Sequence, residues 1–302
     1  KSFRLCYGNR KLRFFLDSTL LFKAMETADA DIYFLRSPIL NVGHVGTFCL
    51  IQRKRFVFSM NSDYICEPRY LKDLPKAVNY SYQWGLKRAD KVIAQTHYQQ
   101  KQLELNFNRK SLVIKNAIEL PIGFFRKKNP PVILWVGNIT KEKNPELFLK
   151  LAQAIHTAKF KIIVAPNPKE ESHYEEIKKL ANAISNSEFL GFVPYHKINH
   201  YFDEASIFVN TSLYEGFPNT FLQAWARYVP VVSLEIDPDE CICKNKLGFH
   251  SKTFEQMVKD VKLLLENENL RREMGVNARR YVEKEHDIKK IVKDYIRIFE
   301  TL

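Results

Sequence analysis

Glu215 and Gln223 are polar side chains on a segment where a tight turn leads into a helix. The turn at residues 215–218 ends a short apolar run at 205–209, and the pattern after it predicts a helix over 219–228. The first N–H groups of such a helix have no partner inside it and suit an anion such as a phosphate. A carboxylate repels phosphate, so we expect Glu215 to accept hydrogen bonds from other donors, and sugar hydroxyls are suitable. Gln223 lies about two turns along the same face, so one side chain could bind a hexose and the other a ribose.

The elements around this turn follow from the apolar pattern and from two prolines. Apolar residues surround nearly the whole circumference of the helix at 219–228, which indicates that the helix is buried. Pro218 suits the first helical turn because its missing N–H would have no partner there. Pro230 ends the helix before an apolar pair that predicts a strand. Residues 205–234 are therefore expected to form a strand, a turn, a buried helix and a second strand.

The same residues resemble the signature of a known family. Glu-Gly-Phe-Pro at 215–218, the amide at 223, and the Ala-Trp-Ala and Val-Pro-Val-Val that follow are similar to the donor site of retaining GT-B glycosyltransferases of family 4, often called group 1. That family has Glu at both ends of the signature, whereas Gln223 keeps the length and an acceptor oxygen without the charge. The alternative is a strand, turn and helix of another α/β protein with an incidental Glu. The resemblance implies a nucleotide-sugar donor bound by Glu215, Gly216, Phe217, Asn219, Thr220 and Gln223.

A second segment, Val-Gly-Asn-Ile-Thr-Lys-Glu-Lys-Asn-Pro at 136–145, leads from a predicted strand into a helix. It resembles the family's Val-Gly-Arg…Lys loop, in which an Arg and a Lys five positions later hold the donor diphosphate. Lys143 matches the Lys, and Asn138 stands where the Arg is usual. The resemblance implies that Lys143 and Glu215 are the catalytic residues. Lys143 would stabilise the charge that grows on the departing diphosphate, and Glu215 would hold the sugar. The alternative for Lys143 is a surface cation in a polar loop.

Three further positions are expected near the ligands. Gly-Phe-Val-Pro at 191–194 resembles the family's turn beside the nucleobase, which implies a donor contact at Val193. Asn61 follows a predicted strand at 55–60 and aligns with a family position that often holds a His touching the sugar. His44 stands in a segment with two glycines that predicts a loop, and it could face the ligands or be a structural His. Asn61 and His44 are thus the candidates on the acceptor and sugar side.

Predicted strands and helices alternate along most of the chain, which indicates parallel sheets. We expect an α/β, GT-B architecture of two doubly wound, Rossmann-like domains, with ligands at the carboxyl ends of their strands. The expected domains are residues 1–121, an acceptor-side domain, residues 122–285, a donor domain, and residues 286–302, a helix that packs back on the first domain. The family opens with βα units and a glycine-rich turn that are not visible here. We therefore expect an incomplete first sheet with an exposed edge.

The charge of the chain is uneven. The net charge is +13, and residues 1–121 carry 20 basic against 10 acidic residues, or +10, while residues 122–302 carry 27 against 24, or +3. A basic half suits nucleic acid, an anionic membrane or an anionic substrate. Because no nucleic-acid motif accompanies the charge, we expect no nucleic-acid partner. In the family the first half receives the acceptor, so the charge favours a glycan or lipid-linked acceptor and leaves open peripheral contact with an anionic membrane.

The cysteines predict neither a disulfide framework nor a metal site. There are five of them, and Cys241-Ile-Cys243 lacks both a second pair and a nearby set of His ligands. An odd number without a framework suggests a reducing cytosol, and no signal peptide or long apolar span is seen. We therefore expect a cytoplasmic protein with no metal and no cofactor besides the donor substrate. A peripheral position at the inner face of the membrane is left open.

The predicted function is a metal-independent, retaining transfer of a hexose from a nucleoside diphosphate sugar to a glycan or glycolipid, as in polysaccharide biosynthesis. A sugar-nucleotide epimerase on the same fold is an alternative, and so is a non-catalytic relative that binds nucleotide sugars, which Asn138 and the missing opening turn favour. A nicotinamide-dependent dehydrogenase is disfavoured because the ten glycines include no Gly-x-Gly pair.

Overall fold

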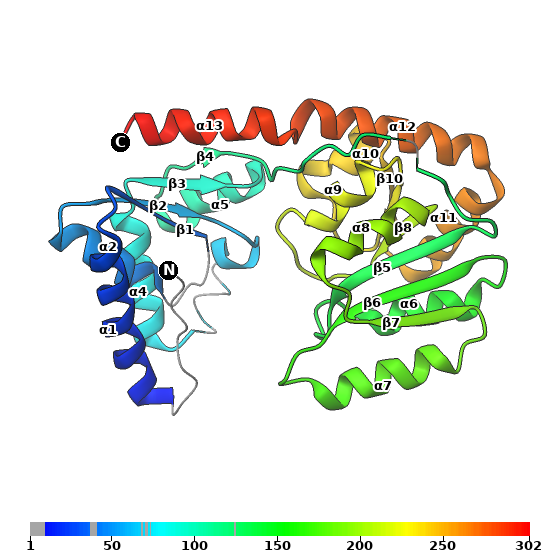
Figure 1. Ribbon diagram of the computed structural model, residues 1–302, viewed down its shortest axis with the longest axis horizontal. Helices are drawn as coiled ribbons and strands as arrows, with labels where there is room; N and C mark the ends of the chain where they lie inside the picture. The colour runs from blue at the N-terminus through cyan, green and yellow to red at the C-terminus, as the bar shows by residue number, and fades with distance from the viewer. Residues whose placement is uncertain (1–9, 37–40, 68, 70–71, 73, 124) are drawn as a thin grey trace. The chain divides into compact units, whose positions relative to one another are not determined.

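The computed structural model describes residues 10–36, 41–67, 69, 72, 74–123 and 125–302 of the chain. It divides into two compact units (Figure 1). The first consists of Lys1–Ile114 with Lys293–Leu302, and the second is Lys115–Val292. The sequence-based boundaries at residues 121 and 285 thus lie within the second unit.

The first unit contains a parallel sheet with strand order β1-β2-β3-β4, so β1 lies at one edge of the described sheet. The end of α13 (Ile288–Glu300) packs on this edge strand, where the Phe34 ring contacts those of Tyr295 and Phe299 with centroids 5.8 and 6.3 Å apart. The elements, in chain order, are α1 (Arg10–Ala28), β1 (Ile32–Arg36), α2 (Val42–Ile51), β2 (Arg55–Ser59), η2 (Tyr64–Cys66), α4 (Lys76–Arg88), β3 (Lys91–Ala94), α5 (His97–Phe107) and β4 (Leu112–Val113).

His44 lies in helix α2, so the predicted loop at this position is wrong. The glycines beside it serve the packing of α2 against α4. A Cβ on Gly43 would lie 2.1 Å from the Ser81 Oγ, and one on Gly85 would lie 2.3 Å from the carbonyl carbon of Val42. The two helices approach so closely that a side chain has no room at these positions. In the sequence, glycines needed for helix packing look the same as glycines that indicate a loop.

The second unit contains a six-stranded parallel sheet with the order β10-β9-β8-β5-β6-β7. Its helices lie on both faces of the sheet, as Figure 1 shows. The elements are β5 (Val132–Asn138), α6 (Pro145–Ala154), β6 (Lys159–Ala165), α7 (Glu171–Asn182), β7 (Ser187–Gly191), α8 (Tyr195–Glu204), β8 (Ile207–Asn210), α9 (Asn219–Trp225), β9 (Val231–Ser233), η3 (Pro238–Glu240), α10 (Cys241–Asn245), β10 (Gly248–His250), α11 (Phe254–Glu266), α12 (Glu268–Glu285) and the start of α13.

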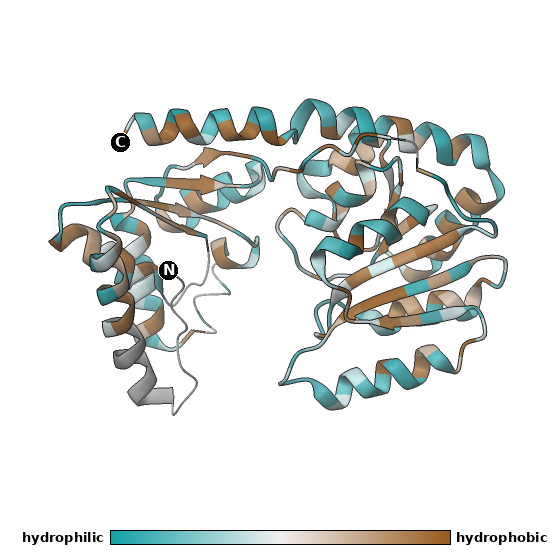
Figure 2. Cartoon of the chain, in the orientation of Figure 1, coloured by the Kyte–Doolittle hydropathy of each residue, from teal (hydrophilic) through white to brown (hydrophobic). Residues whose placement is uncertain are grey.

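The central strands β5, β8 and β9 of this sheet are mostly apolar and buried on both faces, as buried parallel strands are. In β5, Ile133 and Trp135 point into one core cluster, whereas Leu134 points into the other. The same alternation places Val209 and Phe208 of β8 on opposite faces. In Figure 2 the strands are mostly brown and the helices around them carry teal outer faces. The predicted burial of α9 is confirmed, since its residues 221–225 are all buried.

The order of the strands fixes where a ligand can bind. The chain leaves β5 toward β6 on one side of the sheet and reaches β8 on the other, so the direction of winding reverses between β5 and β8. In open α/β sheets the crevice at the carboxyl ends of two such strands is the usual ligand site. The loops after β5 and β8 carry Lys143 and Glu215, and the two predicted segments therefore meet at this point.

In the second unit, the elements that the sequence did not predict are short and lie at the sheet edge. After β9 come η3, α10 and the three-residue strand β10. Gly248 begins β10 with φ of 146°, and a Cβ there would lie 1.9 Å from the Val231 carbonyl oxygen. Three residues are too few to show an alternating pattern. Among the described residues, no helix is both long and apolar enough to cross a membrane.

Candidate active site

A pocket of about 270 Å³ lies at the carboxyl ends of the central strands of the second unit. The loops that follow β5, β7 and β8 contribute to it, together with the end of strand β6 and the starts of α8 and α9. Seven of the nine donor-site residues predicted from the sequence line the pocket. The full lining is Val136, Gly137, Asn138, Lys143, Ile163, Ala165, Phe192, Val193, Tyr195, Ile198, Glu215, Pro218, Asn219, Thr220 and Gln223.

Lys143 and Glu215 form an ion pair in this pocket. They are 72 residues apart in the sequence, and each extends from one of the two loops at the reversal of strand order. The Lys143 side chain is 25% exposed and that of Glu215 is 17% exposed, so both remain accessible from the pocket. The pair is partly shielded from water, which makes the attraction stronger than that of a surface pair.

Lys143 is positioned by a chain of buried hydrogen bonds that starts in β5. The Trp135 indole N–H donates to the Thr211 hydroxyl at 2.9 Å, and this hydroxyl donates to the backbone carbonyl of Lys143 at 2.7 Å. The Leu213 N–H donates to the Glu142 carbonyl at 2.8 Å and joins the same two loops again. The loops after β5 and β8 are thus tied together through their backbones, and the ion pair follows from that tie.

The turn of the signature is held from the other side by Asn116. Its Nδ2 donates to the Phe217 carbonyl at 2.8 Å and to the Asn219 Oδ1 at 3.0 Å. The carbonyl of Asn116 accepts a bond of 2.7 Å from His286 Nδ1. The His286 ring also packs against Phe217 in a tilted arrangement, with centroids 4.7 Å apart. Residues far apart in the sequence therefore orient one side chain of the pocket, Asn219.

Gln223 lines the pocket from the second turn of α9 and is held in place by two hydrogen bonds. Its side-chain Nε2 donates to Asn199 Oδ1 at 3.2 Å, and its backbone carbonyl accepts from the Arg227 guanidinium at 3.2 Å. Arg227 is in turn paired with Asp203 at 2.6 Å. Because Asn199 takes one amide hydrogen of Gln223, the amide oxygen remains an acceptor for a ligand.

Two aromatic residues that the sequence analysis did not assign lie at the rim of the pocket. Phe192 is 61% exposed and Tyr195 is 76% exposed, and both line the pocket beside Val193. Both rings border the pocket, and a ring beside a pocket can stack on a planar ligand. The signal in the sequence was the pair of aromatics around the turn at 191–194. Asn116 and His286, in contrast, gave no sequence signal of their contacts with the turn.

The remaining predicted residues lie elsewhere. Gly216 and Phe217 are buried beneath the turn, and Phe217 packs on Trp225 with the ring centroids 6.2 Å apart. They shape the turn and do not line the pocket. Asn61 is exposed just after β2 in the first unit, and His44 lies in helix α2 of that unit.

The pocket combines one cation, one carboxylate, several amides and hydroxyls, and an aromatic rim. Among its described lining residues, Lys143 is the only cation and Glu215 the only acid. A ligand phosphate would compete with Glu215 for Lys143, and the released carboxylate could accept hydrogen bonds from hydroxyl groups. This set of side chains matches a ligand with an anionic part, a polyol part and a planar ring.

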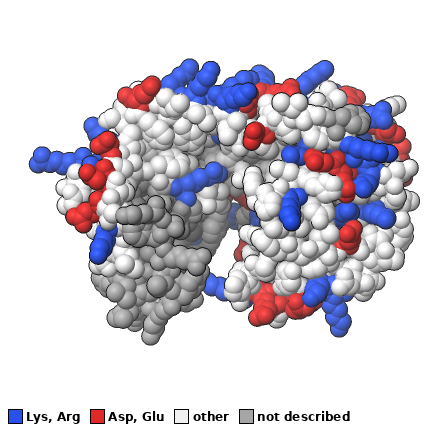
Figure 3. All heavy atoms as spheres, in the orientation of Figure 1, with Lys and Arg blue, Asp and Glu red and all other residues white. Residues whose placement is uncertain are grey.

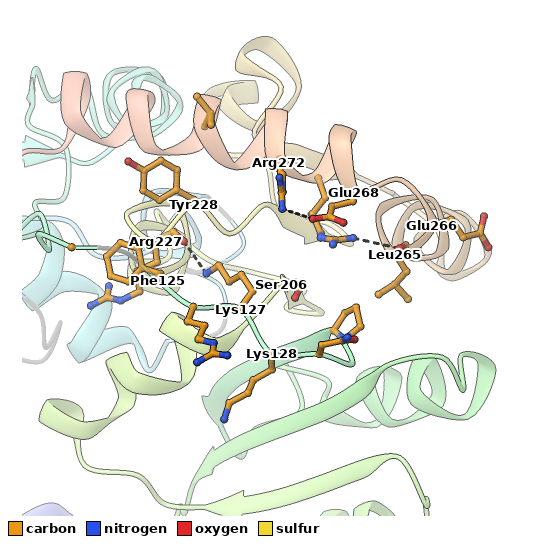
Figure 4. Close-up of a pocket in the computed structure, with 16 residues that line it drawn as sticks. Phe125, Lys127, Lys128, Ser206, Arg227, Tyr228, Leu265, Glu266, Glu268 and Arg272 are labelled. Atoms are coloured by element: carbon orange, nitrogen blue, oxygen red, sulfur yellow. Dashed lines mark hydrogen bonds and ion pairs between the residues drawn. The ribbon is translucent and has the colours of Figure 1, made fainter.

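A second hollow of the same unit, of about 1140 Å³, is lined in part by the segment that precedes β5. Figure 4 shows Lys127 at its centre, directed toward Arg227. The Lys127 ammonium donates to the carbonyls of Arg227 at 2.9 Å, Asp203 at 3.2 Å and Phe202 at 3.4 Å. Two of these carbonyls end helix α8, where they have no partner within the helix. Burial lowers the pKa of Lys127 to about 7. Lys127 therefore caps α8 and anchors the incoming segment.

On the face of the second unit that Figure 3 shows, no large patch carries only positive or only negative side chains. Lys and Arg alternate with Asp and Glu over this face in Figure 3. This mixture agrees with the nearly balanced charge of residues 122–302, and it leaves the polar groups inside the pocket to select the ligand.

Residues 119–281 match the family described as "Glycosyl transferases group 1". The match covers more than half of the chain, so the chain belongs to this family. Both Lys143 and Glu215 lie within the matched residues, and the family-level resemblance read from the sequence is confirmed.

Curated relatives agree with this family. The chain is 25% identical over 215 residues to an uncharacterized glycosyltransferase of Haemophilus influenzae, an alignment that covers 68% of this chain and 60% of that protein. It is 22% identical over 253 residues to the amylovoran biosynthesis glycosyltransferase AmsD of Erwinia amylovora, which covers 80% of this chain and 70% of AmsD. The chain thus spans less than two thirds of the Haemophilus relative.

Solved structures confirm the fold. HepE of Anabaena, in complex with UDP and glucose, is similar with a TM-score of 0.78 and 14% identity over 94% of this chain and 82% of HepE. The sucrose-phosphate synthase of Thermosynechococcus elongatus gives a TM-score of 0.81 and 15% identity over 98% of this chain and 80% of that one. The predicted architecture of two parallel-sheet α/β domains of the GT-B type is therefore confirmed.

The buried His286 should make the protein sensitive to acid. Burial lowers the pKa of His286 to about 4, from 6.5. The unfolded chain therefore binds a proton between these pH values that the folded chain does not, so stability is full above pH 6.5 and is lost as the pH falls toward 4. The loss from this group should be about 3 kcal/mol. Urea unfolding of wild type and of His286→Gln across this range measures it, with the exposed His196→Gln as the control. Equal acid sensitivity of His286→Gln and wild type would contradict the assignment.

Replacing Lys127 by Met should destabilise the second unit by about 1–3 kcal/mol, because three carbonyls lose their donor. The neighbouring Lys128→Met is the matched control. Lys128 is 57% exposed and pairs with the mostly buried Glu204 at 3.0 Å. Because Glu204 keeps Lys161 as a second partner at 3.3 Å, the loss of the exposed Lys128 should cost about 1 kcal/mol or less. Thermal and urea unfolding compare the two variants. A loss of stability that is the same in both would show that Lys127 is not an anchor.

Proposed function

We propose that this chain is a retaining glycosyltransferase of family 4 that moves a hexose from a nucleoside diphosphate sugar to a glycan or glycolipid, without a metal in the reaction. The observation that carries the proposal is the meeting of Lys143, Glu215 and Gln223 in one pocket at the reversal of strand order. A cation, a carboxylate and an amide in this order suit a diphosphate, a sugar and a ribose.

The donor would lie across the pocket with its diphosphate beside Lys143. Asn138 and the polar groups at the start of α9, Asn219 and Thr220, would supply neutral hydrogen-bond donors to the same oxygens. Glu215 would leave Lys143 and accept bonds from the sugar hydroxyls. In the free pocket, the ion pair therefore holds Lys143 and Glu215 in position. When the donor binds, the contact between them would be replaced by contacts of each residue with the donor.

The nucleoside would occupy the other end of the pocket. The oxygen of Gln223 would accept a hydrogen bond from a ribose hydroxyl, and Val193 with the rim aromatics Phe192 and Tyr195 would contact the base. Stacking on an aromatic ring stabilises a base by about 1–3 kcal/mol without selecting among bases. The identity of the base would then depend on backbone groups of the turn at 191–194.

Transfer breaks the bond between the anomeric carbon and the phosphate oxygen, so negative charge grows on the leaving diphosphate. The Lys143 ammonium is the charged donor of the pocket and would stabilise that charge. Retention requires either a nucleophile behind the anomeric carbon or attack on the same face as the leaving group. Because Glu215 is the only acid among the described lining residues and is needed for the sugar, we favour attack on the same face.

We further propose a uridine diphosphate hexose as the first donor to test. Structures of the similar protein HepE contain UDP with glucose and UDP-glucose, and the relative AmsD is described as a glycosyltransferase of amylovoran biosynthesis. The acceptor would be a growing polysaccharide or a lipid-linked glycan. Asn61 and His44 of the first unit are the candidates for contact with the sugar and acceptor. Action in the cytoplasm, with peripheral contact between the basic first half and an anionic membrane, completes the proposal.

A non-catalytic relative that binds nucleotide sugars is the second candidate. It is favoured by Asn138 in place of the usual Arg, which leaves Lys143 as the single cation of the described lining. Such a protein would be stabilised by UDP and UDP-sugars in thermal shift measurements and would neither hydrolyse nor transfer them. Release of an epimerised nucleotide sugar without acceptor would instead identify an epimerase.

Lys143→Ala should lower donor turnover by about 10²- to 10³-fold, the usual loss for one preorganised donor in a transition state. Lys141→Ala is the matched control, because Lys141 is exposed on the same loop and does not line the pocket. Release of UDP from UDP-glucose measures turnover, and thermal shifts with UDP measure binding. Unchanged turnover in Lys143→Ala, or an equal loss in Lys141→Ala, would contradict the proposed role.

A further inference from the structure

Three side chains of types that bind metal ions lie together at the edge of the second sheet. Asp237 precedes η3, Cys243 lies in α10, and His250 is the last residue of β10. Each offers one ligand atom, and these atoms all lie within 4.8 Å of one another. His250 Nδ1 is 4.0 Å from Asp237 Oδ2. None of the three lines the pocket that binds the proposed donor.

The fold brings these residues together although the sequence spacing gives no metal motif. Strands β9 and β10 are parallel neighbours, and His250 pairs with Ser233 at the end of β9. The chain therefore leaves β9 at the same edge where β10 ends, and Asp237 and His250 lie on this edge. Helix α10, between the two strands, adds Cys243. The sequence analysis found no His ligand for Cys241 and Cys243, whereas the sheet supplies His250.

His250 has no hydrogen bond that would explain its orientation. Its side chain is 18% exposed. The Nδ1 atom faces Asp237 at a distance beyond a hydrogen bond. The Nε2 atom is buried and has no partner among the described residues. An imidazole that is mostly buried and has no hydrogen bond calls for an additional group, such as an ion.

Asp237, in contrast, is fixed in place and still has free acceptor capacity. Its side chain is 3% exposed. Oδ1 accepts the Ile242 N–H at 2.7 Å, and Oδ2 accepts the Cys243 N–H at 3.3 Å. A carboxylate has about four lone-pair positions, and the Cys243 thiol also donates to Asp237, so one position remains for a further group. Hydrogen bonds that orient a carboxylate in this way are typical of metal ligands.

The distances and atom types favour zinc. Bonds of about 2.0–2.3 Å from Zn²⁺ to nitrogen, oxygen and sulfur place tetrahedral ligand atoms about 3–4 Å apart. The observed spacing needs only a small movement of the side chains to close. A thiolate, an imidazole and a carboxylate suit Zn²⁺, whereas Mg²⁺ and Ca²⁺ prefer oxygen alone. Cys243 is exposed, so a metal can reach the site and a water can occupy a fourth position.

We propose that Asp237, Cys243 and His250 form a zinc site that fastens the edge of the second sheet. The ion binds Cys243 after displacing the thiol proton, and it joins the segment after β9, helix α10 and the end of β10. Its role is structural, and the proposal does not depend on the donor or on the reaction of the neighbouring pocket.

Cobalt binding to the full chain tests this site. The protein is treated with a chelator and titrated with Co²⁺, which gives a thiolate-to-metal absorption band when Cys is a ligand, and Zn²⁺ then displaces the cobalt. Cys243→Ser and His250→Ala remove ligands. Cys241→Ala is the matched control, because it removes a buried thiol from the same helix. Thermal unfolding without metal establishes that each variant is folded.

Wild type and Cys241→Ala should bind one Co²⁺ with the thiolate band, and Zn²⁺ should raise their melting temperature. Cys243→Ser and His250→Ala should bind at least about 100-fold more weakly, since loss of a second-shell partner alone costs about 10- to 100-fold. A second measurement uses wild type only. Zn²⁺ should protect Cys243 from alkylation, as mapped by mass spectrometry.

The absence of a thiolate band in wild type would overturn the proposal, and so would a band that persists in Cys243→Ser. An alkylation rate of Cys243 that does not change with Zn²⁺ would overturn it as well. None of these results would bear on donor turnover, so the zinc site and the proposed function fail separately.

Discussion

The site depends on hydrogen bonds that join the loop after β5 to the loop after β8. These two strands are neighbours in the sheet, and the direction of winding reverses between them. The hydroxyl of Thr211 receives the Trp135 indole N–H and donates to the Lys143 carbonyl, so β5, the loop after β5 and the loop after β8 share one buried chain of bonds. Lys143 and Glu215 meet because of this series of hydrogen bonds. A cation and an acid that are 72 residues apart thus reach one pocket through backbone constraints and do not rely on their own attraction.

Under the proposed function, this arrangement would let one cation serve a doubly charged ligand. In the free pocket Glu215 balances Lys143, which avoids an unpaired charge in a partly shielded place. A diphosphate that replaced Glu215 would free the carboxylate for neutral hydroxyl partners. The neutral residues Asn138, Gln223 and Asn219 add hydrogen bonds without adding charge. Asn219 is itself held by Asn116. His286, which is far from both in the sequence, orients Asn116 through its carbonyl.

The sequence was sufficient for the architecture and for most of the pocket, because both depend on local patterns. Buried parallel strands read as apolar runs, and the turn at 215–218 carries its own glycine and proline. The sequence did not reveal contacts between distant elements. His286 touches the turn only in the folded unit, and Gly43 and Gly46 serve helix packing in a pattern that also predicts loops. The short strand β10 gave no periodic signal, and for that reason His250 could not be placed beside Cys243.

A crystal structure of the chain with UDP-glucose tests the central claim most directly. The account predicts that a diphosphate oxygen lies about 3 Å from Lys143 Nζ, within hydrogen-bond distance, and that the Glu215 carboxylate has turned to the glucose hydroxyls. Nucleotide bound elsewhere, with the pair of Lys143 and Glu215 intact, would contradict it.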